Sequence, residues 1–231
     1  MTFRKIALPI VTVAGLISSL PAMAINAGDL LVRARVISIM PKDSSTDVTS
    51  SATGGTVPGP TVSVDKGYSL DIDFTYMITK NIGAELLLDL TSKHDVKSSG
   101  ATLAGLAPGK IIETRVLPPA LILQYHFAPD AKIRPYAGVG VNYTRFLSTK
   151  ATDSLKTGLG GVGDPKLDPS WGIVGQVGVD YDIGNNWFLN ADLKYMKIKT
   201  TAKFNSGALG DVSTDVKIDP WVLGFGIGKR F

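Results

Sequence analysis

Acidic residues stand at every second or fourth position in two segments of this chain, a spacing that places them on one face of a β-strand. Asp71 and Asp73 form the first set, and Glu85 and Asp89 form the second. Gln176 and Lys194 hold corresponding positions in later segments. An isolated charge is costly to remove from water, so carboxylates on an enclosed face require cationic or hydrogen-bonding partners. The pattern predicts polar interior positions at Asp71, Asp73, Glu85, Asp89 and Gln176, which form either a salt-bridged plug or a closed polar lumen.

The sequence offers few residues that could carry out acid–base catalysis. The chain contains two histidines, His94 and His126. Asp95 follows His94 directly, but adjacent residues of a strand point to opposite faces, so this pair does not form a dyad by itself. The sequence has no phosphate-binding loop, dinucleotide fingerprint or metal-ligand cluster. We therefore expect no enzymatic activity, no cofactor and no metal site.

The N-terminal segment has the composition of a secretory signal. Arg4 and Lys5 precede a mostly apolar stretch over residues 6–20, and Ala22-Met23-Ala24 is a small-x-small cleavage motif. The apolar stretch is short for a membrane helix, which needs roughly 20 residues. We expect residues 1–24 to be a cleaved signal peptide and residues 25–231 to form the mature protein.

The composition of the rest of the chain excludes several classes. The 24 basic and 20 acidic residues become 22 and 20 when Arg4 and Lys5 are removed, which gives no basic surface for nucleic acid. The chain has no cysteine and therefore no disulfide framework. Beyond the signal there is no long apolar run, so a closed β-barrel is the remaining way to span a membrane.

Eight segments alternate apolar residues with polar or small residues, as strands with two different faces do. They cover approximately residues 29–40, 68–76, 83–90, 111–127, 133–146, 171–182, 187–196 and 221–231. Long polar connections at about 41–65, 91–110, 147–169 and 200–214 alternate with short turns. This predicts an all-β fold, an eight-stranded antiparallel transmembrane barrel with long extracellular loops and short periplasmic turns.

Aromatic residues mark the ends of the predicted apolar faces. Tyr76, Trp171, Trp187, Trp221 and Phe231 are expected to form girdles at the two membrane interfaces. A soluble barrel of the lipocalin type is the rival fold, but it would turn its apolar face inward and would need no girdle. A last strand that ends in Phe231 is typical of outer-membrane barrels, in which this residue closes the barrel and is read by the barrel-assembly machinery.

Several ordered motifs resemble one family in particular. They are Phe74-Thr75-Tyr76-Met77, Leu117-Pro118-Pro119, the run from Arg134 to Tyr143, Gly175-Gln176-Val177-Gly178-Val179-Asp180-Tyr181 and Asp219-Pro220-Trp221. Over nearly the whole mature chain the sequence resembles the OmpW family of outer-membrane proteins, which includes OprG and AlkL. The resemblance implies a monomer among the lipids of a Gram-negative outer membrane, with a passive route for small, mostly hydrophobic solutes.

The Pro118-Pro119 pair gives this route a possible exit. Proline donates no backbone hydrogen bond, so two in succession interrupt a strand ladder. The resemblance implies that solutes leave sideways through the barrel wall at such a gap. The alternative is a β-bulge that bends the strand without traffic through it.

The resemblance also implies an apolar constriction inside the channel. Leu87 matches one of its positions, whereas Lys194 stands where close relatives carry tryptophan. Lys194 is expected either to pair with Glu85 or Asp89 or to favour a more polar or anionic solute. The expected path runs from the loop end past Leu87, Ile122 and Lys194 to Pro118 and Pro119. The alternative function is a structural or surface-interaction barrel with a closed lumen and no transport.

Overall fold

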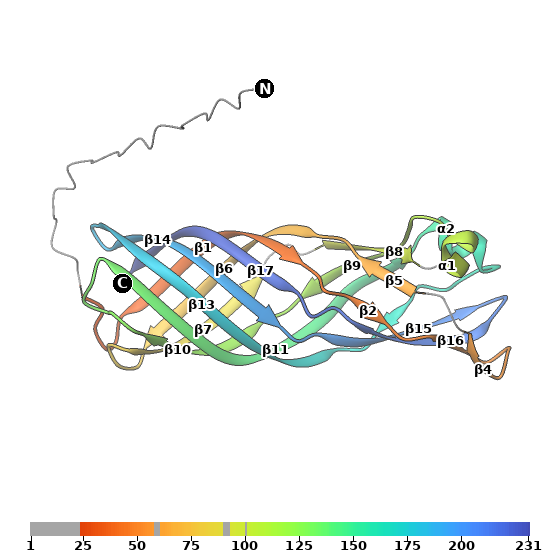
Figure 1. The fold of residues 1–231 in the computed structure, drawn as a ribbon, viewed down its shortest axis with the longest axis horizontal. Coiled ribbons are helices and arrows are strands. Elements are labelled where there is room, and N and C mark those ends of the chain that lie inside the picture. The colour runs from red at the N-terminus through yellow and green to blue at the C-terminus, as the bar shows by residue number, and fades with distance from the viewer. Residues whose placement is uncertain (1–23, 58–60, 90–92, 100) are drawn as a thin grey trace, which may run out of the picture.

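Eight antiparallel strands close into a barrel in the computed structural model, which describes residues 24–57, 61–89, 93–99 and 101–231 (Figure 1). The predicted signal peptide lies outside the described residues except for Ala24. The neighbouring strands of the barrel are hydrogen bonded in the order β10–β7–β6–β1–β17–β14–β13–β11, and β11 pairs again with β10. Their bounds are β1 Leu30–Met40, β6 Gly67–Met77, β7 Ile82–Asp89, β10 Ala120–His126, β11 Ile133–Ala151, β13 Ser170–Gly184, β14 Trp187–Met196 and β17 Trp221–Arg230.

The first and last strands join at a continuous seam. Strand β17 pairs with β1 from Leu31↔Arg230 to Met40↔Trp221. Phe231 extends this ladder, because its N–H donates to the Leu30 carbonyl at 2.9 Å and its carbonyl accepts from the Leu30 N–H at 3.0 Å. The last residue of the chain is therefore part of the barrel closure.

Three short turns connect the strands at the end that carries the C-terminus. The turn Gly184-Asn185-Asn186 places Asn185 and Asn186 at φ values of 53° and 66°, the left-handed backbone that tight hairpins require. The opposite end carries the long connections (Figure 1). No helix among the described residues is long and apolar enough to cross a membrane.

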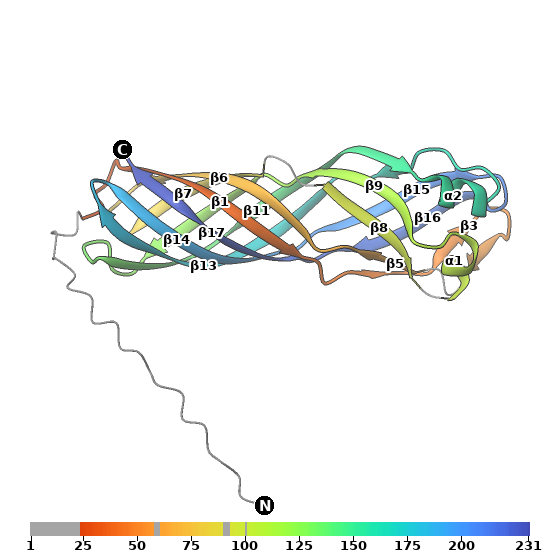
Figure 2. The same ribbon diagram turned by 90° about the horizontal axis from the view of Figure 1, so that it is seen from above.

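The long connections differ from the loops predicted by the sequence, because most of their described residues extend the barrel as additional β-structure (Figure 2). One group of pairings joins β5 (Thr61–Val64), β8 (Lys93–Ser99) and β9 (Lys110–Leu117) to the end of β11. The other comprises β2 (Ser44–Ser45), β3 (Val48–Ser50), β4 (Gly55–Val57), β12 (Lys166–Leu167), β15 (Lys199–Ser206) and β16 (Gly210–Lys217). Two short helices, α1 (Ala101–Leu106) and α2 (Asp153–Gly158), lie near the tip.

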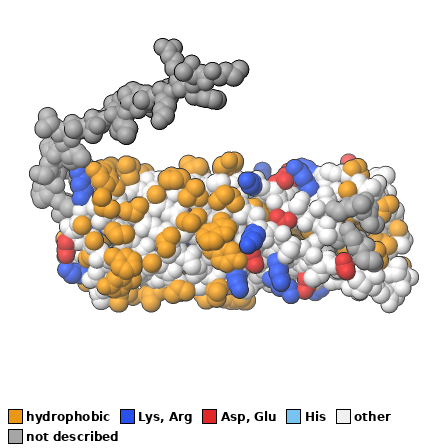
Figure 3. Space-filling model, viewed as in Figure 1, with side chains coloured by type: hydrophobic (Ala, Val, Ile, Leu, Met, Phe, Trp, Pro, Cys, Tyr) orange, Lys and Arg blue, Asp and Glu red, His pale blue; other side chains and the backbone are white. Residues whose placement is uncertain are grey.

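An apolar belt covers the outside of the barrel (Figure 3). Its exposed members include Val36, Leu70, Leu86, Leu121, Val139, Ile173, Leu189 and Phe225. Aromatic side chains border the belt, and those at the loop-side border contact each other: the ring centroids of Trp171 and Tyr143 are 4.7 Å apart, and those of Trp221 and Tyr195 are 5.0 Å apart. Tyr76, Trp187 and Phe231 are exposed at the opposite border, as expected for a girdle.

Glycines in β17 make room for bulky side chains inside the barrel. A Cβ atom at Gly226 would overlap the Ala34 carbonyl oxygen and the side chain of Arg35, and one at Gly228 would overlap the ring of Phe188. The small face of the last strand therefore lets Arg35 and Phe188 lie across the lumen.

Candidate functional site

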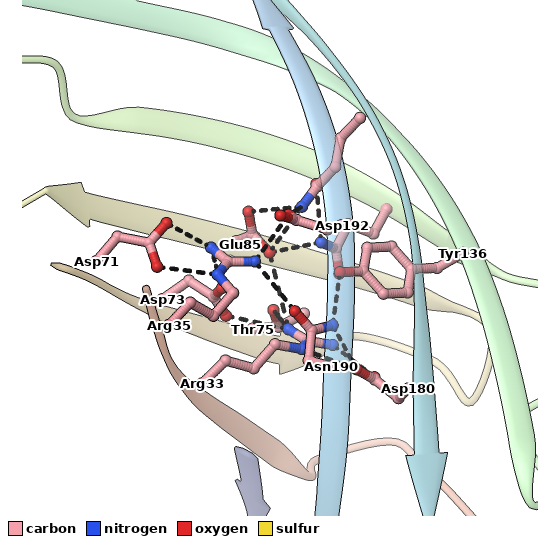
Figure 4. A network of polar contacts seen from close by, with 12 residues as sticks. Arg33, Arg35, Asp71, Asp73, Thr75, Glu85, Tyr136, Asp180, Asn190 and Asp192 are labelled. Carbon is pink, nitrogen blue, oxygen red and sulfur yellow. Dashed lines mark hydrogen bonds and ion pairs between the residues drawn. The ribbon is translucent and has the colours of Figure 1, made fainter. Parts of the chain in front are cut away.

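Two buried arginines of β1 organise the interior of the barrel (Figure 4). Arg33 donates to Asp73 at 3.0 Å and to Asp180 at 2.8 Å, and Arg35 contacts Asp71 at 2.9 Å. Arg35 also reaches Asp73 at 2.6 Å and Asp192 at 2.7 Å. These pairs connect strands on different sides of the barrel and fill the lumen with charged groups of opposite sign, and burial makes such pairing necessary.

Amide and hydroxyl groups complete this ion-pair network. Gln124 donates to Glu85 at 2.6 Å, while Gln176 donates to Asp192 at 2.9 Å and to Glu85 at 3.3 Å. The amide of Asn190 donates to Asp180 at 2.7 Å and to the Tyr136 hydroxyl at 3.0 Å. The network therefore obstructs an axial route through the barrel, in keeping with the narrow interior of eight strands.

Lys194 lies at the boundary between the network and the space above it. Its side chain is fully buried, and its ammonium pairs with Asp192. The prediction that Lys194 pairs with Glu85 or Asp89 is therefore not met among the described residues. The reason is that Asp192 precedes it by two positions on β14, on the same inward face.

An apolar cavity of about 180 Å³ lies on the loop side of Lys194. For comparison, a dry apolar cavity of about 150 Å³ is large enough to take benzene. Leu87, Ile37, Met196 and Val222 line its lower part, and the β-structured extension supplies further apolar walls. Those walls include Val96, Ile112, Leu155, Leu159, Phe204 and Val212. The polar groups at its floor are Asp71, Asp89, His94 and Lys194.

The ladder between β7 and β10 is interrupted where this cavity reaches Pro118. Strand β9 ends at Leu117 and β10 begins at Ala120, so the two prolines separate them. On one side the ladder continues, because the Tyr143 N–H donates to the Pro119 carbonyl at 3.0 Å. On the other side, the pairing of β10 with β7 stops at Ala120↔Leu87, and the pairing of β9 with β8 begins at Arg115↔Lys93. Leu88 and Asp89 form no ladder pairs with Pro119 and Pro118, and residues 90–92, which follow toward β8, lie outside the described residues.

The backbone of Pro118 faces this interruption. In an extended strand the N–H and C=O of one residue point to the same side, and those of the next residue point to the other. Since the Pro119 carbonyl is bonded to β11, the backbone nitrogen of Pro118 is directed toward β7 and β8. Because proline has no backbone N–H, Pro118 offers no hydrogen-bond donor on the side that faces β7 and β8.

The structure separates the residues of the predicted solute path into two groups. Leu87, Lys194 and Pro118 line the cavity. Pro119 and Ile122 do not line it, and the fully buried side chain of Ile122 packs in the apolar cluster with Leu87, Ala120 and Val174. Of the predicted polar interior residues, Asp71 and Asp89 reach the cavity floor, whereas Asp73, Glu85 and Gln176 lie within the network.

Sequence reasoning left Arg33 and Arg35 out of the polar interior. Their spacing of two, on the face opposite Val32 and Ala34, is the signal that could have identified them. The apolar lining of the extension was missed as well, although Thr200, Ala202 and Phe204 alternate with polar neighbours in β15.

The two histidines lie apart. His126 is buried near the turn end, where its ring stacks on Tyr136 at a centroid distance of 5.2 Å. His94 lies on β8, five residues beyond the end of β7, beside Gly67. Within the described ranges, no group of three or more His, Cys, Asp or Glu residues is arranged to hold a metal ion.

Comparison with known proteins gives one consistent result. A family model described as the OmpW family matches residues 26–231. Outer membrane protein W of Vibrio cholerae serotype O1 is 39% identical over 219 residues, which cover 93% of this chain and 94% of the relative. Outer membrane protein AlkL of Ectopseudomonas oleovorans is 31% identical over 180 residues, which cover 77% of this chain and 72% of the relative.

A solved structure agrees with the sequence matches. The crystal structure of the outer membrane protein OprG from Pseudomonas aeruginosa superposes with a TM-score of 0.83 at 33% sequence identity, covering 90% of this chain and 98% of that one. Together with the apolar belt, these relatives place the protein in the outer membrane of a Gram-negative bacterium.

Proposed function

Because the chain belongs to the OmpW family of outer-membrane proteins, we propose that it is a passive channel for small hydrophobic or amphipathic molecules. The observation that carries this proposal is the apolar cavity, which is bounded below by the buried ion-pair network and reaches Pro118 at the wall interruption. Binding in such a cavity stabilises a hydrophobic solute by roughly 25 cal/mol for each Å² of apolar surface removed from water.

The direction of exit follows from the network. A solute that continued along the barrel axis would have to displace the ion pairs of Arg33 and Arg35, which leaves buried charges unpaired. A solute that moves sideways at Pro118 meets an interrupted ladder and then the apolar belt. We therefore propose lateral release into the outer leaflet. No cofactor, energy source or catalytic group takes part.

The cavity floor sets the proposed preference among solutes. Lys194 directs its ammonium to Asp192, and its remaining N–H donors lie at the polar boundary of an otherwise apolar space. A carboxylate head would meet Asp71 and Asp89 there, so an uncharged acceptor such as a hydroxyl or carbonyl oxygen fits better. Amphipathic molecules with such heads are therefore proposed as solutes beside purely apolar ones.

Uptake of a fluorescent hydrophobic probe by whole cells tests the proposal. Cells that carry the wild type should take up the probe faster than cells that lack the protein, and Pro118→Ala/Pro119→Ala should slow this uptake. The single variants provide a matched control. Pro118→Ala restores a donor on the interrupted side, whereas Pro119→Ala restores one on the β11 side, so Pro118→Ala should have the larger effect.

The level of folded barrel in each strain is checked by the shift in gel mobility on heating. Unchanged uptake in the folded double variant would contradict lateral release. Equal uptake with and without the wild-type protein would instead favour a structural or surface-interaction barrel with a closed lumen.

A further inference from the structure

Exposed cations follow the loop-side aromatic border at a regular spacing. Lys66 lies two residues beyond Tyr68, Arg145 lies two residues beyond Tyr143, and Lys197 lies two residues beyond Tyr195. Lys42 stands in the same relation to Met40, which pairs with Trp221. All four cations are exposed. Residues two apart on a strand share a face, so these side chains lie on the outside, directly above the apolar belt.

Strands β8 and β9 add two cations opposite each other. Lys93 pairs directly with Arg115 in the ladder, and both side chains are exposed. Arg115 lies two residues from Leu117, which pairs with Arg145, so a third cation is on the same outer surface. Like charges directly opposite in a sheet repel each other unless an anion lies between them.

We call these six residues the girdle cations: Lys42, Lys66, Lys93, Arg115, Arg145 and Lys197. Among the residues that the structure describes, none of them forms an ion pair with an acid. They come from six strands or strand ends around the barrel, and Figure 3 shows Lys and Arg side chains at this border of the belt, with Asp and Glu side chains among them.

Several lysines further toward the tip form ion pairs with acids. Lys97 contacts Asp65 at 2.7 Å, Lys199 contacts Asp215 at 2.8 Å, and Lys203 contacts Asp168 at 2.7 Å. The hydrogen bond from Lys199 lowers the pKa of Asp215, as expected for a carboxylate with a close cation. These ion pairs lie further from the apolar belt than the girdle cations, and they provide a comparison set of cations whose charge is already neutralised.

We propose that the girdle cations bind the phosphate groups of phosphorylated glycolipids in the outer leaflet. The height favours a lipid source, since side chains just above an apolar belt face the headgroups of the surrounding leaflet. A phosphate oxygen accepts charge-assisted hydrogen bonds from lysine and arginine, and one phosphate between Lys93 and Arg115 would neutralise their repulsion. This pair lies beside the wall interruption, so a bound lipid would border the proposed exit. The inference does not depend on transport.

Binding of purified diphosphoryl lipid A to the folded barrel in a zwitterionic detergent tests this inference. The double variant Lys93→Gln/Arg115→Gln removes two girdle cations, and Lys199→Gln/Lys203→Gln removes the same charge from the paired tier. We expect the first variant to weaken binding by about tenfold or more. The control variant should change the affinity for lipid A by less than about twofold, because exposed ion pairs contribute little free energy. Added salt should weaken wild-type binding.

Stability gives a second readout. Without lipid A, Lys93→Gln should change the unfolding temperature little, because the repulsion between Lys93 and Arg115 is offset by Glu113, whose pKa is lowered by Lys110 and also by Lys93. Addition of lipid A should raise the unfolding temperature of the wild type more than that of the variant, because a ligand stabilises the folded state that it binds.

Three results would overturn the inference. The first is equal weakening by the two double variants, and the second is equal affinity for lipid A whose phosphates have been removed. The third is full competition by inorganic phosphate at the concentration of the lipid, which would assign the site to free phosphate.

Discussion

Replacing Arg35 by methionine is expected to destabilise the folded barrel by about 3–5 kcal/mol, the typical cost of removing one partner from a buried ion pair. The guanidinium is fully buried and lies within 2.9 Å of oxygens on Asp71, Asp73 and Asp192. Its loss leaves three carboxylates with fewer cations in a space closed to water. A change of about 4 kcal/mol corresponds to roughly a thousandfold shift in the unfolding equilibrium.

The assay is urea unfolding of the barrel in phospholipid vesicles. The three tryptophans, Trp171, Trp187 and Trp221, all lie in the outer girdles, so their fluorescence reports on insertion and unfolding. Lys203→Met is the control, because it breaks an exposed ion pair of 2.7 Å that should contribute about 0–1 kcal/mol.

A second variant distinguishes charge from lost packing. Arg35→Met/Asp71→Asn removes the carboxylate that loses its ion pair and should recover part of the lost stability, since Asp71 contacts Arg35 at 2.9 Å whereas Asp73 also contacts Arg33. A loss of less than about 1 kcal/mol in Arg35→Met, or no recovery in the double variant, would refute the account of the network as a mutually dependent plug.

Three further outcomes are expected. Leu87→Trp should slow uptake of a hydrophobic probe in whole cells because it fills the cavity, whereas Leu86→Trp, which faces outward on the same strand, should not. Lys194→Met should raise the uptake of a purely apolar probe relative to a probe with a hydroxyl head, measured as a ratio in the same cells. Gly226→Ala should reduce the heat-modifiable folded fraction on gels, because its Cβ would overlap the backbone of β1, while Gly175→Ala has open space and should fold normally.

The barrel strands could be predicted from the sequence because lipid imposes a strict rule on them. Each outward residue must be apolar, so segments such as 68–76 alternate without interruption. The turn at Asn185-Asn186 and the ladder break at Pro118-Pro119 could also be predicted, since each follows from the local backbone chemistry of the residues concerned.

The β-structured extension was mistaken for loops because the outer faces of its strands contact water, so its outward residues need not be apolar and the alternation is lost. Strand β8, with the sequence KHDVKSS, has few apolar residues, and its pairing partner β9 provides most of the buried side chains. The cavity depends on these strands, so its size and lining could not be derived from the predicted loops.

The partners within the network could not be predicted for a different reason. Arg33 and Asp180 are 147 residues apart and meet only because the barrel closes. Alternation assigns each residue to a face, but the choice between partners depends on strand register and on side-chain length. Lys194 shows the limit, because the nearest acid on its own strand, Asp192, proved to be its partner.

The central claim is that hydrophobic molecules pass through the wall while the axis stays closed. The most direct test compares the uptake of two probes of similar size, one hydrophobic and one hydrophilic, by cells with and without the protein. We expect the protein to speed entry of the hydrophobic probe alone, and we expect Pro118→Ala/Pro119→Ala to remove this gain. Equal acceleration of both probes, unchanged in that variant, would show an open axial route and exclude release through the wall.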